Sequence, residues 1–214
     1  MSKYTEMMRC SIPEGEIGNC KVERFVVSDA DAAFSCIRAF SFIGGGRSVP
    51  AGEYTRLLVD GGIMMSDTPD ELRDHIGPVR SAIGTCLVSG LGLGCVVKGM
   101  LEKKKEDGSY AVDKVVVLEI NEHVIKLVEP HLRKIYGDRL DVRNVDALKY
   151  KPPMGERYDY AWHDIWPTIC EDNLKTMSTL HRKYGRRCDR QGSWQRDRLL
   201  RMRRESKKQS VYWR

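Results

Sequence analysis

The chain has 214 residues, of which 41% are hydrophobic and 31% charged, and its formal net charge is +6. This composition is typical of a soluble globular protein, and it excludes a membrane-spanning one, because no apolar run approaches the ~20 residues that a bilayer requires. The first 20 residues contain no apolar stretch of the signal-peptide type, so we expect a cytoplasmic protein with no membrane partner.

The seven cysteines form an odd set without a C-x-x-C pair. Such a set favours free thiols in a reducing compartment over a disulfide framework or a zinc site. We therefore expect no metal, and the cysteines agree with a cytoplasmic location.

Residues 1–79 predict a small β-rich segment. Residues 21–28 have the composition of a strand, whereas residues 32–42 are compatible with a strand or a helix and are followed by three glycines at 44–46. Two further strands, 54–59 and 63–66, surround the sequence Asp-Gly-Gly, which indicates a hairpin because glycine accepts a positive φ.

A short helix is expected after the hairpin. Asp67, Thr68 and Pro69 can begin it, since proline is favoured at the first helical positions, and it would run toward Ile76.

From residue 85 the pattern changes to alternating strands and helices. Four strands are expected, at residues 85–89, 115–118, 140–145 and 158–162. Helices are expected at residues 95–105, 123–136 and 171–184. Strands separated by helices indicate a parallel sheet with right-handed crossovers, so we predict an α/β, Rossmann-like domain over residues 80–184.

Candidate binding residues follow three consecutive strands of this sheet. The sequence GLGLG begins at Gly90 after the first strand, Glu119 ends the second, and Asp146 follows the third. Ligands of open parallel sheets bind outside the carboxyl ends of the strands. Glycines allow close backbone approach, a strand-end acid can accept from ribose hydroxyls, and Asp146 is suited to an adenine amino group. Together these residues predict an adenosine pocket.

The spacing of the glycines narrows the ligand. The pattern is G-x-G-x-G, and the dinucleotide pattern G-x-G-x-x-G fails because Cys95 stands at the sixth position from Gly90. No GxxxxGK[ST] sequence is present to bind phosphates. An adenosyl compound without a pyrophosphate is therefore favoured.

The segments VSGLGLG, VVVLEIN, VRNVDAL and YDYAWHD resemble class I S-adenosylmethionine-dependent methyltransferases, and within that superfamily the spermidine synthase branch. LVDGGIMMSDTPDELRDH, which ends at His75, is similar to the hairpin segment of that branch. The resemblance covers about residues 54–166. It implies a class I methyltransferase-type fold, with S-adenosylmethionine or decarboxylated S-adenosylmethionine as the cofactor.

The resemblance also implies roles for individual residues. Asp164 corresponds to the base that acts on the attacking amine. The implied cofactor-binding residues are Gly90, Leu91, Gly92, Leu93, Gly94, Glu119, Ile120, Asp146, Ala147 and His75.

Three departures from the synthase pattern concern the amine-binding groups. Leu93 replaces the aspartate that binds the donor's amine, Ile165 to Pro167 replace the second acid after Asp164, and Met64 replaces a glutamine. We therefore favour methyl transfer to an unidentified acceptor. An aminopropyltransferase of the spermidine synthase type stays open, as does a non-catalytic adenosyl- or nucleic-acid-binding protein.

The residues around Asp164 also have structural interpretations. Asp164 can act as a general base or cap the turn before Pro167, and the sequence leaves both open. Trp162 and Trp166 could wall a substrate pocket, but strand-end aromatics belong more often to the core. His163 is expected to pack against a helix.

The positive charge is concentrated at the C-terminal end. From His181 onward there are 13 Lys/Arg and 3 Asp/Glu, so the preceding residues are mildly acidic. Residues 185–214 are expected to form a basic tail with a short helix around Leu199, Leu200 and Met202. We favour a solvated end over a nucleic-acid-binding arm, because no nucleic-acid motif is recognisable. A small-molecule acceptor is expected in preference to a macromolecule, while nucleic acid binding through the tail and a homodimer stay open.

Overall fold

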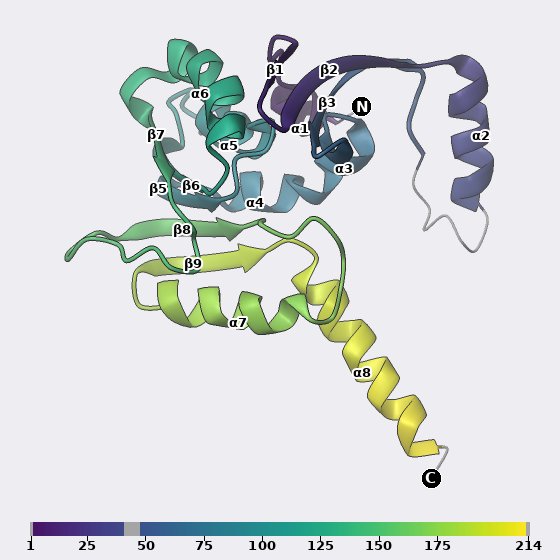
Figure 1. Ribbon diagram of the computed structural model, residues 1–214. Coiled ribbons are helices and arrows are strands. Elements are labelled where there is room, and N and C mark those ends of the chain that lie inside the picture. The colour runs from purple at the N-terminus through teal and green to yellow at the C-terminus, as the bar shows by residue number, and fades with distance from the viewer. Residues whose placement is uncertain (1, 41–47, 213–214) are drawn as a thin grey trace.

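The computed structural model describes residues 2–40 and 48–212, and these residues form two β-sheets. The first sheet is antiparallel, in the order β1 (Gly15–Ile17), β2 (Cys20–Val27), β3 (Gly52–Val59) and β4 (Gly62–Ser66). The second is parallel, in the order β7-β6-β5-β8-β9 (Figure 1). The predicted α/β class with a preceding β-rich segment is confirmed.

The parallel sheet contains the four predicted strands and one more. Its strands are β5 (Gly84–Ser89), β6 (Val112–Glu119), β7 (Leu140–Asn144), β8 (Tyr158–His163) and β9 (Cys188–Ser193). The helices that follow strands of this sheet are α5 (Cys95–Glu102), α6 (Glu122–Tyr136), α7 (Asn173–Tyr184) and α8 (Arg196–Tyr212), and a short 3-10 turn, η1 (Gly137–Arg139), precedes β7.

Side chains of the central strands alternate between the two faces of the sheet. Val88 of β5 and Val117 of β6 pack in one core cluster with residues of α5 and α6. Leu87 and Val116, one position earlier, pack on the opposite face with Leu180 of α7. This alternation has the period of two that a strand imposes, and it explains why the central residues of both strands, 86–88 and 115–118, are apolar.

The N-terminal segment shares its core with the parallel sheet. Met8 of α1 (Lys3–Met8) and Leu72 of α3 (Pro69–Asp74) are fully buried in the same cluster as Val88 and Val97. Helix α4 (Ile76–Ser81) follows α3 directly and leads into β5.

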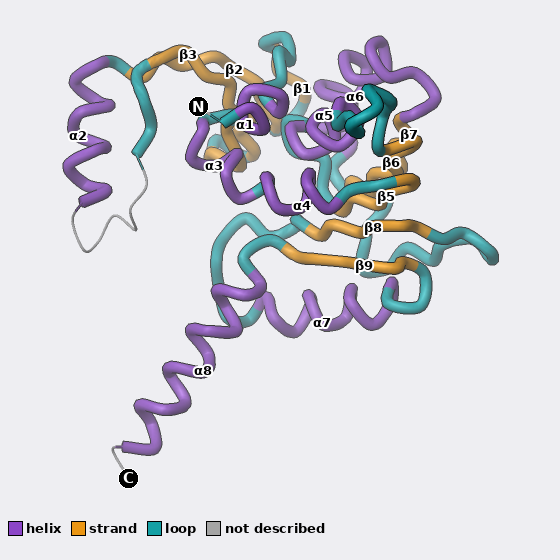
Figure 2. The backbone as a smooth tube through the Cα atoms, turned by 180° about the vertical axis from the view of Figure 1, so that it is seen from behind, coloured by secondary structure: helices purple, strands orange, loops and turns teal. Residues whose placement is uncertain are grey.

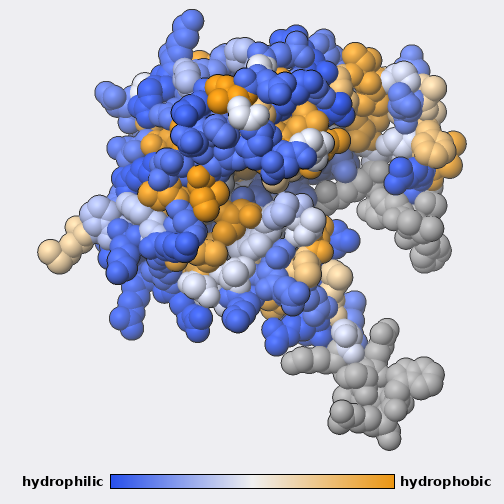
Figure 3. All heavy atoms as spheres, viewed as in Figure 1, coloured by the Kyte–Doolittle hydropathy of each residue, from blue (hydrophilic) through white to orange (hydrophobic). Residues whose placement is uncertain are grey.

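The hairpin β3–β4 has the predicted tight turn. Asp60 and Gly61 have φ values of 51° and 76°, the two positive values that a two-residue hairpin loop requires. The segment for which a strand or a helix was expected is helical over α2 (Asp29–Phe40), and residues 41–42 and the glycines at 44–46 lie outside the described residues. Helix α2 projects from the body and exposes Phe34 and Ile37, and Figure 3 shows hydrophobic atoms on this part of the surface.

The sheet extends beyond the boundary expected at residue 184. Strand β9 pairs with β8 in parallel, from Tyr158 opposite Cys188 to His163 opposite Ser193. Helix α8 begins three residues after β9, and its Leu199 is fully buried against Leu174 and Met177 of α7. Residues 188–199 of the expected basic tail therefore belong to the folded body.

All seven cysteines are free thiols, as predicted, and five of them are buried. Over residues 2–40 and 48–212, no helix combines the length and the apolar character that crossing a bilayer requires.

Candidate functional site

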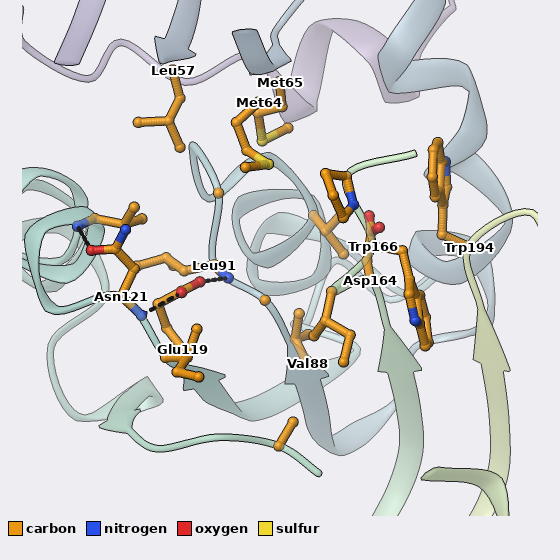
Figure 4. A pocket seen from close by; sticks show the side chains of 18 of the residues that line it. Leu57, Met64, Met65, Val88, Leu91, Glu119, Asn121, Asp164, Trp166 and Trp194 are labelled. Carbon is orange, nitrogen blue, oxygen red and sulfur yellow. Dashed lines mark hydrogen bonds between the residues drawn. The ribbon is translucent and has the colours of Figure 1, made fainter. Parts of the chain in front are cut away.

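A cavity of about 690 Å³ lies at the carboxyl ends of the parallel strands, under the β3–β4 hairpin (Figure 4). Its wall includes nine of the residues that the sequence indicated, which are His75, Gly90, Leu91, Gly92, Glu119, Ile120, Asp146, Ala147 and Asp164. The volume lies within the range of about 300–1,000 Å³ that is usual for small-molecule sites. The fold thus brings the end of α3 and the ends of four strands together around one cavity.

The glycine loop after β5 fits closely between two other parts of the protein. Gly90 has φ +95°, and a Cβ atom there would overlap the carbonyl oxygen of Asp164. A Cβ atom at Gly92 would overlap the Sδ atom of Met65 in the hairpin. Glycine is therefore favoured at Gly90 by the backbone of Asp164 and at Gly92 by its φ of +52°, whatever the cavity binds.

Glu119 occupies the end of β6 and connects it to the glycine loop. Its side chain is 8% exposed, its Oε2 atom accepts from the backbone N–H of Leu91, and its Oε1 atom accepts from that of Asn121, each at 2.8 Å. A carboxylate oxygen can accept a second hydrogen bond, so both atoms keep acceptor capacity for a ligand. A carboxylate with free acceptor capacity and no donor has the chemistry to pair with two hydroxyl groups, such as those of a ribose.

Asp146 follows β7 beside Glu119. The backbone N–H of Val145 donates to the carbonyl oxygen of Glu119 at 2.9 Å, which fixes the two strand ends together. The Oδ1 atom of Asp146 accepts from the N–H of Leu148, and its Oδ2 atom is 3.7 Å from the Lys149 ammonium. Asp146 thus lines the cavity beside Glu119, with both of its carboxylate oxygens in contact with the turn that follows β7.

Asp164 and His75 meet on the other side of the cavity. The Nε2 atom of His75 lies 3.8 Å from Oδ2 of Asp164, and the two side chains are 7% and 24% exposed. Burial, with the charges of Asp74 and Glu71, raises the pKa of Asp164 to about 7. Burial lowers the pKa of His75 to about 4, so this imidazole is neutral near pH 7. Asp164 therefore has the titration behaviour of a group that exchanges protons at neutral pH.

Leu93 and Gly94, which the sequence also indicated, are not among the residues that line the cavity. The Leu93 side chain is fully buried in the core cluster that contains Val97 and Leu132. The turn into α5 directs Leu93 inward, and its N–H donates to the Met65 Sδ atom at 3.0 Å. Leu93 therefore cannot contact the amino-acid end of a cofactor through its side chain.

Three tryptophans line the cavity wall near Asp164, and we call this wall the Trp side. They are Trp162, Trp166 and Trp194. In Figure 4, Asp164, Trp166 and Trp194 lie together on the side opposite Glu119 and Asn121. The Trp162 side chain is only 7% exposed and belongs to the core cluster as well.

Trp194 and Asp74 were not found by the sequence analysis. The indole N–H of Trp194 donates to Oδ2 of Asp74 at 3.1 Å, and the side-chain amide of Gln195 donates to the same atom at 2.6 Å. Trp194 follows strand β9, which the sequence analysis did not expect. Asp74 lies in the segment ending at His75, but that segment gave no reason to single out Asp74. His163, by contrast, packs against the rings of His181 and Tyr184 in α7, as expected of a structural histidine.

No protein-family model matches the sequence, and no curated protein does either. One similar solved structure is a dimethyladenosine transferase from Plasmodium falciparum, with 23% sequence identity and a TM-score of 0.39. The match covers 54% of this chain and 36% of that one. The N-methyltransferase NodS from Bradyrhizobium japonicum, in complex with S-adenosyl-L-homocysteine, has 13% identity, coverage of 54% and 57%, and a TM-score of 0.39. An S-adenosylmethionine-dependent methyltransferase from Clostridium acetobutylicum has 10% identity, coverage of 56% and 44%, and a TM-score of 0.37. The matched part spans 36% to 57% of these three chains.

Proposed function

We propose that this chain is an S-adenosylmethionine-dependent methyltransferase whose acceptor binds beside Asp164. The observation that carries the proposal is one continuous cavity with two different ends. Glu119 and Asp146 provide hydrogen-bond acceptors at one end, and Asp164 provides a titrating carboxyl at the other. The glycine loop, with Gly90 and Leu91, lies between them (Figure 4).

The residues at the first end would hold the adenosyl group. Glu119 would accept from the ribose hydroxyls, and Asp146 with Ala147 would surround the adenine, next to Ile120. When bound, S-adenosylmethionine supplies a methyl group on a positively charged sulfur. The hydrophobic side chains of Leu57, Met64 and Met65 line the same cavity.

Asp164 would handle the proton of the acceptor. Transfer breaks the bond between the methyl carbon and sulfur and forms a bond from that carbon to the acceptor. Asp164 takes the proton that a neutral amine or hydroxyl acceptor loses, and its pKa of about 7 suits this exchange at neutral pH. Holding both reactants in one cavity supplies much of the acceleration, because methyl transfer depends strongly on orientation.

Aminopropyl transfer of the spermidine synthase type is the second candidate. Glu71, Asp74 and Asp164 together make the Trp side acidic, which would attract a polyamine. Against it, Leu93 stands where the synthases have their donor-binding aspartate, and its side chain is buried in the core.

Calorimetry with S-adenosylmethionine, S-adenosylhomocysteine and decarboxylated S-adenosylmethionine tests the proposal. We expect the first two compounds to bind at least about tenfold more tightly than the third, which corresponds to about 1.4 kcal/mol. Tighter binding of the decarboxylated compound, with conversion of putrescine to spermidine detected by mass spectrometry, would overturn methyl transfer in favour of aminopropyl transfer. Failure of all three compounds to bind would remove both candidates.

A further inference from the structure

A second cavity lies at the base of α8, next to the Trp side of the main cavity. Its volume is about 360 Å³, and we call it the α8 pocket. Asp74 and Trp162 line both cavities, so the two adjoin. The other residues of the α8 pocket are His181, Gln191, Gly192, Ser193, Gln195, Arg196, Asp197, Arg198 and Arg201.

Two residues that line the α8 pocket carry buried hydrogen-bond donors for which the described structure offers no acceptor, and one of the two, Trp162, also lines the main cavity. Within the described part of the chain, neither the Nε atom of Arg196 nor the Nε1 atom of Trp162 has a hydrogen-bond partner, although both atoms are buried. The Trp162 side chain is 93% buried, since its exposed fraction is 7%. Buried N–H groups are rarely left unpaired in folded proteins. The unpaired Nε atom of Arg196, with the charges of Arg196, Arg198 and Arg201 and the N-terminal end of α8, indicates a ligand that carries anionic oxygens.

The acidic groups of the α8 pocket do not cancel this charge, because the three arginines outnumber Asp74 and Asp197. Asp74 accepts from Trp194 and Gln195, and Asp197 is exposed in the first turn of α8. Among the residues described, no carboxylate forms an ion pair with Arg196, Arg198 or Arg201.

Helix α8 continues the positive charge away from the pocket. It has 17 residues, so it is about 26 Å long, and it projects from the body in both backbone views (Figures 1 and 2). Its sequence, RDRLLRMRRESKKQSVY, holds seven basic residues against two acidic ones, and Arg201, Arg203, Arg204 and Lys208 are exposed. A helix of this length and charge can lie along several phosphates of a nucleic acid strand.

We propose that α8 and the α8 pocket bind the backbone phosphates of a single-stranded polynucleotide, one base of which enters the main cavity as the methyl acceptor. The second part rests on the proposed methyltransferase function, and the first does not. The tryptophans favour a nucleic acid over an anionic membrane or an acidic protein, because bases stack on aromatic rings. They favour a single strand over a duplex, because a base must be unstacked before it can enter a cavity beside Asp164.

Fluorescence anisotropy of the full chain with a labelled, ~20-nucleotide single-stranded RNA tests the binding, with DNA of the same sequence, its duplex and phosphatidylserine vesicles as comparisons. The variant R198Q/R201Q removes two charges at the α8 pocket. The matched control K126Q/R133Q removes two exposed charges from α6. We expect the first variant to lose at least about tenfold in affinity and to lower the salt slope by one to two, and the control to stay near wild type.

The outcomes for the two proposals differ. Equal affinity of the two variants for the single strands, or binding to vesicles alone, would overturn the α8 proposal while leaving adenosyl binding untouched. If the wild-type protein binds the polynucleotide but does not bind S-adenosylhomocysteine, the methyltransferase proposal is overturned instead. Both proposals are supported if the wild-type protein methylates one of the strands and R198Q/R201Q does not, while the variant keeps its affinity for S-adenosylhomocysteine. The strand that the wild-type protein methylates, RNA or DNA, then identifies the sugar of the substrate.

Discussion

The Oε2 atom of Glu119 accepts a hydrogen bond from the backbone N–H of Leu91 at 2.8 Å, so the end of β6 holds the glycine loop that follows β5. The other carboxylate oxygen binds the N–H of Asn121, which caps α6 with its own side chain. One carboxylate therefore shapes the loop, fixes the start of the next helix and presents acceptors to the cavity.

The substitution Glu119→Gln should weaken adenosyl binding without unfolding the protein. The amide keeps one acceptor oxygen, but its NH₂ group replaces the other oxygen and is a donor. This NH₂ group would face a backbone N–H and could not accept a hydrogen bond from a ribose hydroxyl. We expect at least a tenfold loss of affinity for S-adenosylhomocysteine by calorimetry, about 1.4 kcal/mol, with a modestly lower melting temperature. Glu122→Gln changes an exposed carboxylate that pairs with Lys126 and should bind as wild type. Equal affinity of the two variants would place Glu119 outside the site.

Asp164 should make the stability of the protein depend on pH. Its pKa of about 7 in the folded state exceeds its usual value of 3.8, so between about pH 4 and 7 the folded state keeps a proton that the unfolded state has released. Its contribution to the free energy of unfolding therefore falls as pH rises, by up to about 1.4 kcal/mol per pH unit. Asp164→Asn cannot release this proton, so its stability should improve relative to wild type from pH 5 to pH 7.

Urea unfolding at several pH values checks this, with the exposed Asp138→Asn as control. Wild type and Asp138→Asn should show the same pH dependence. If the curve of Asp164→Asn runs parallel to theirs, Asp164 titrates normally and its role as a base loses support.

Gly90→Ala and Gly155→Ala form a matched pair. Both glycines have a positive φ, 95° and 84°, but a Cβ atom at Gly90 would overlap the Asp164 carbonyl, whereas none lies near Gly155. We expect Gly155→Ala to cost about 1–2 kcal/mol for its backbone conformation alone. Gly90→Ala should cost a further ~1–3 kcal/mol, because it separates the ends of β5 and β8. Equal losses in chemical denaturation would mean that these strand ends are not tightly packed.

Ending the chain after Tyr184 should unfold the protein. If residues 185–214 were a tail outside the fold, this truncation would leave the fold intact. This truncation removes β9 and leaves β8 as an exposed edge, and it also removes Leu199 from its contacts with α7. Ending the chain after Met202 retains both and should preserve a cooperative thermal transition by circular dichroism. A cooperative transition near the wild-type temperature for the shorter chain would show that β9 is dispensable.

The predictions that succeeded rest on local signals. The hairpin turn depends on Asp60 and Gly61 alone, and the central strands are apolar because both faces are covered. Strand β9, CDRQGS, lacks this pattern because it is an edge strand, mostly part-exposed, that depends on pairing with β8. No local signal separates Leu91 from Leu93 in GLGLG, since only the turn into α5 decides which of them reaches the cavity. Trp194 and Asp74 could not be paired from sequence, because 120 residues separate them.

The hydrogen bonds from Trp194 and Gln195 to Asp74 also set an order of assembly during synthesis. The glycine loop, Glu119 and Asp146 are all synthesised before β9, but the parallel sheet that carries them is complete only when β9 pairs with β8. The Trp side closes only after residue 195 has left the ribosome and has found a partner made 121 residues earlier. Contacts of such long sequence separation form late in folding. Both ends of the cavity would therefore become complete only after residue 195 is available to the rest of the chain.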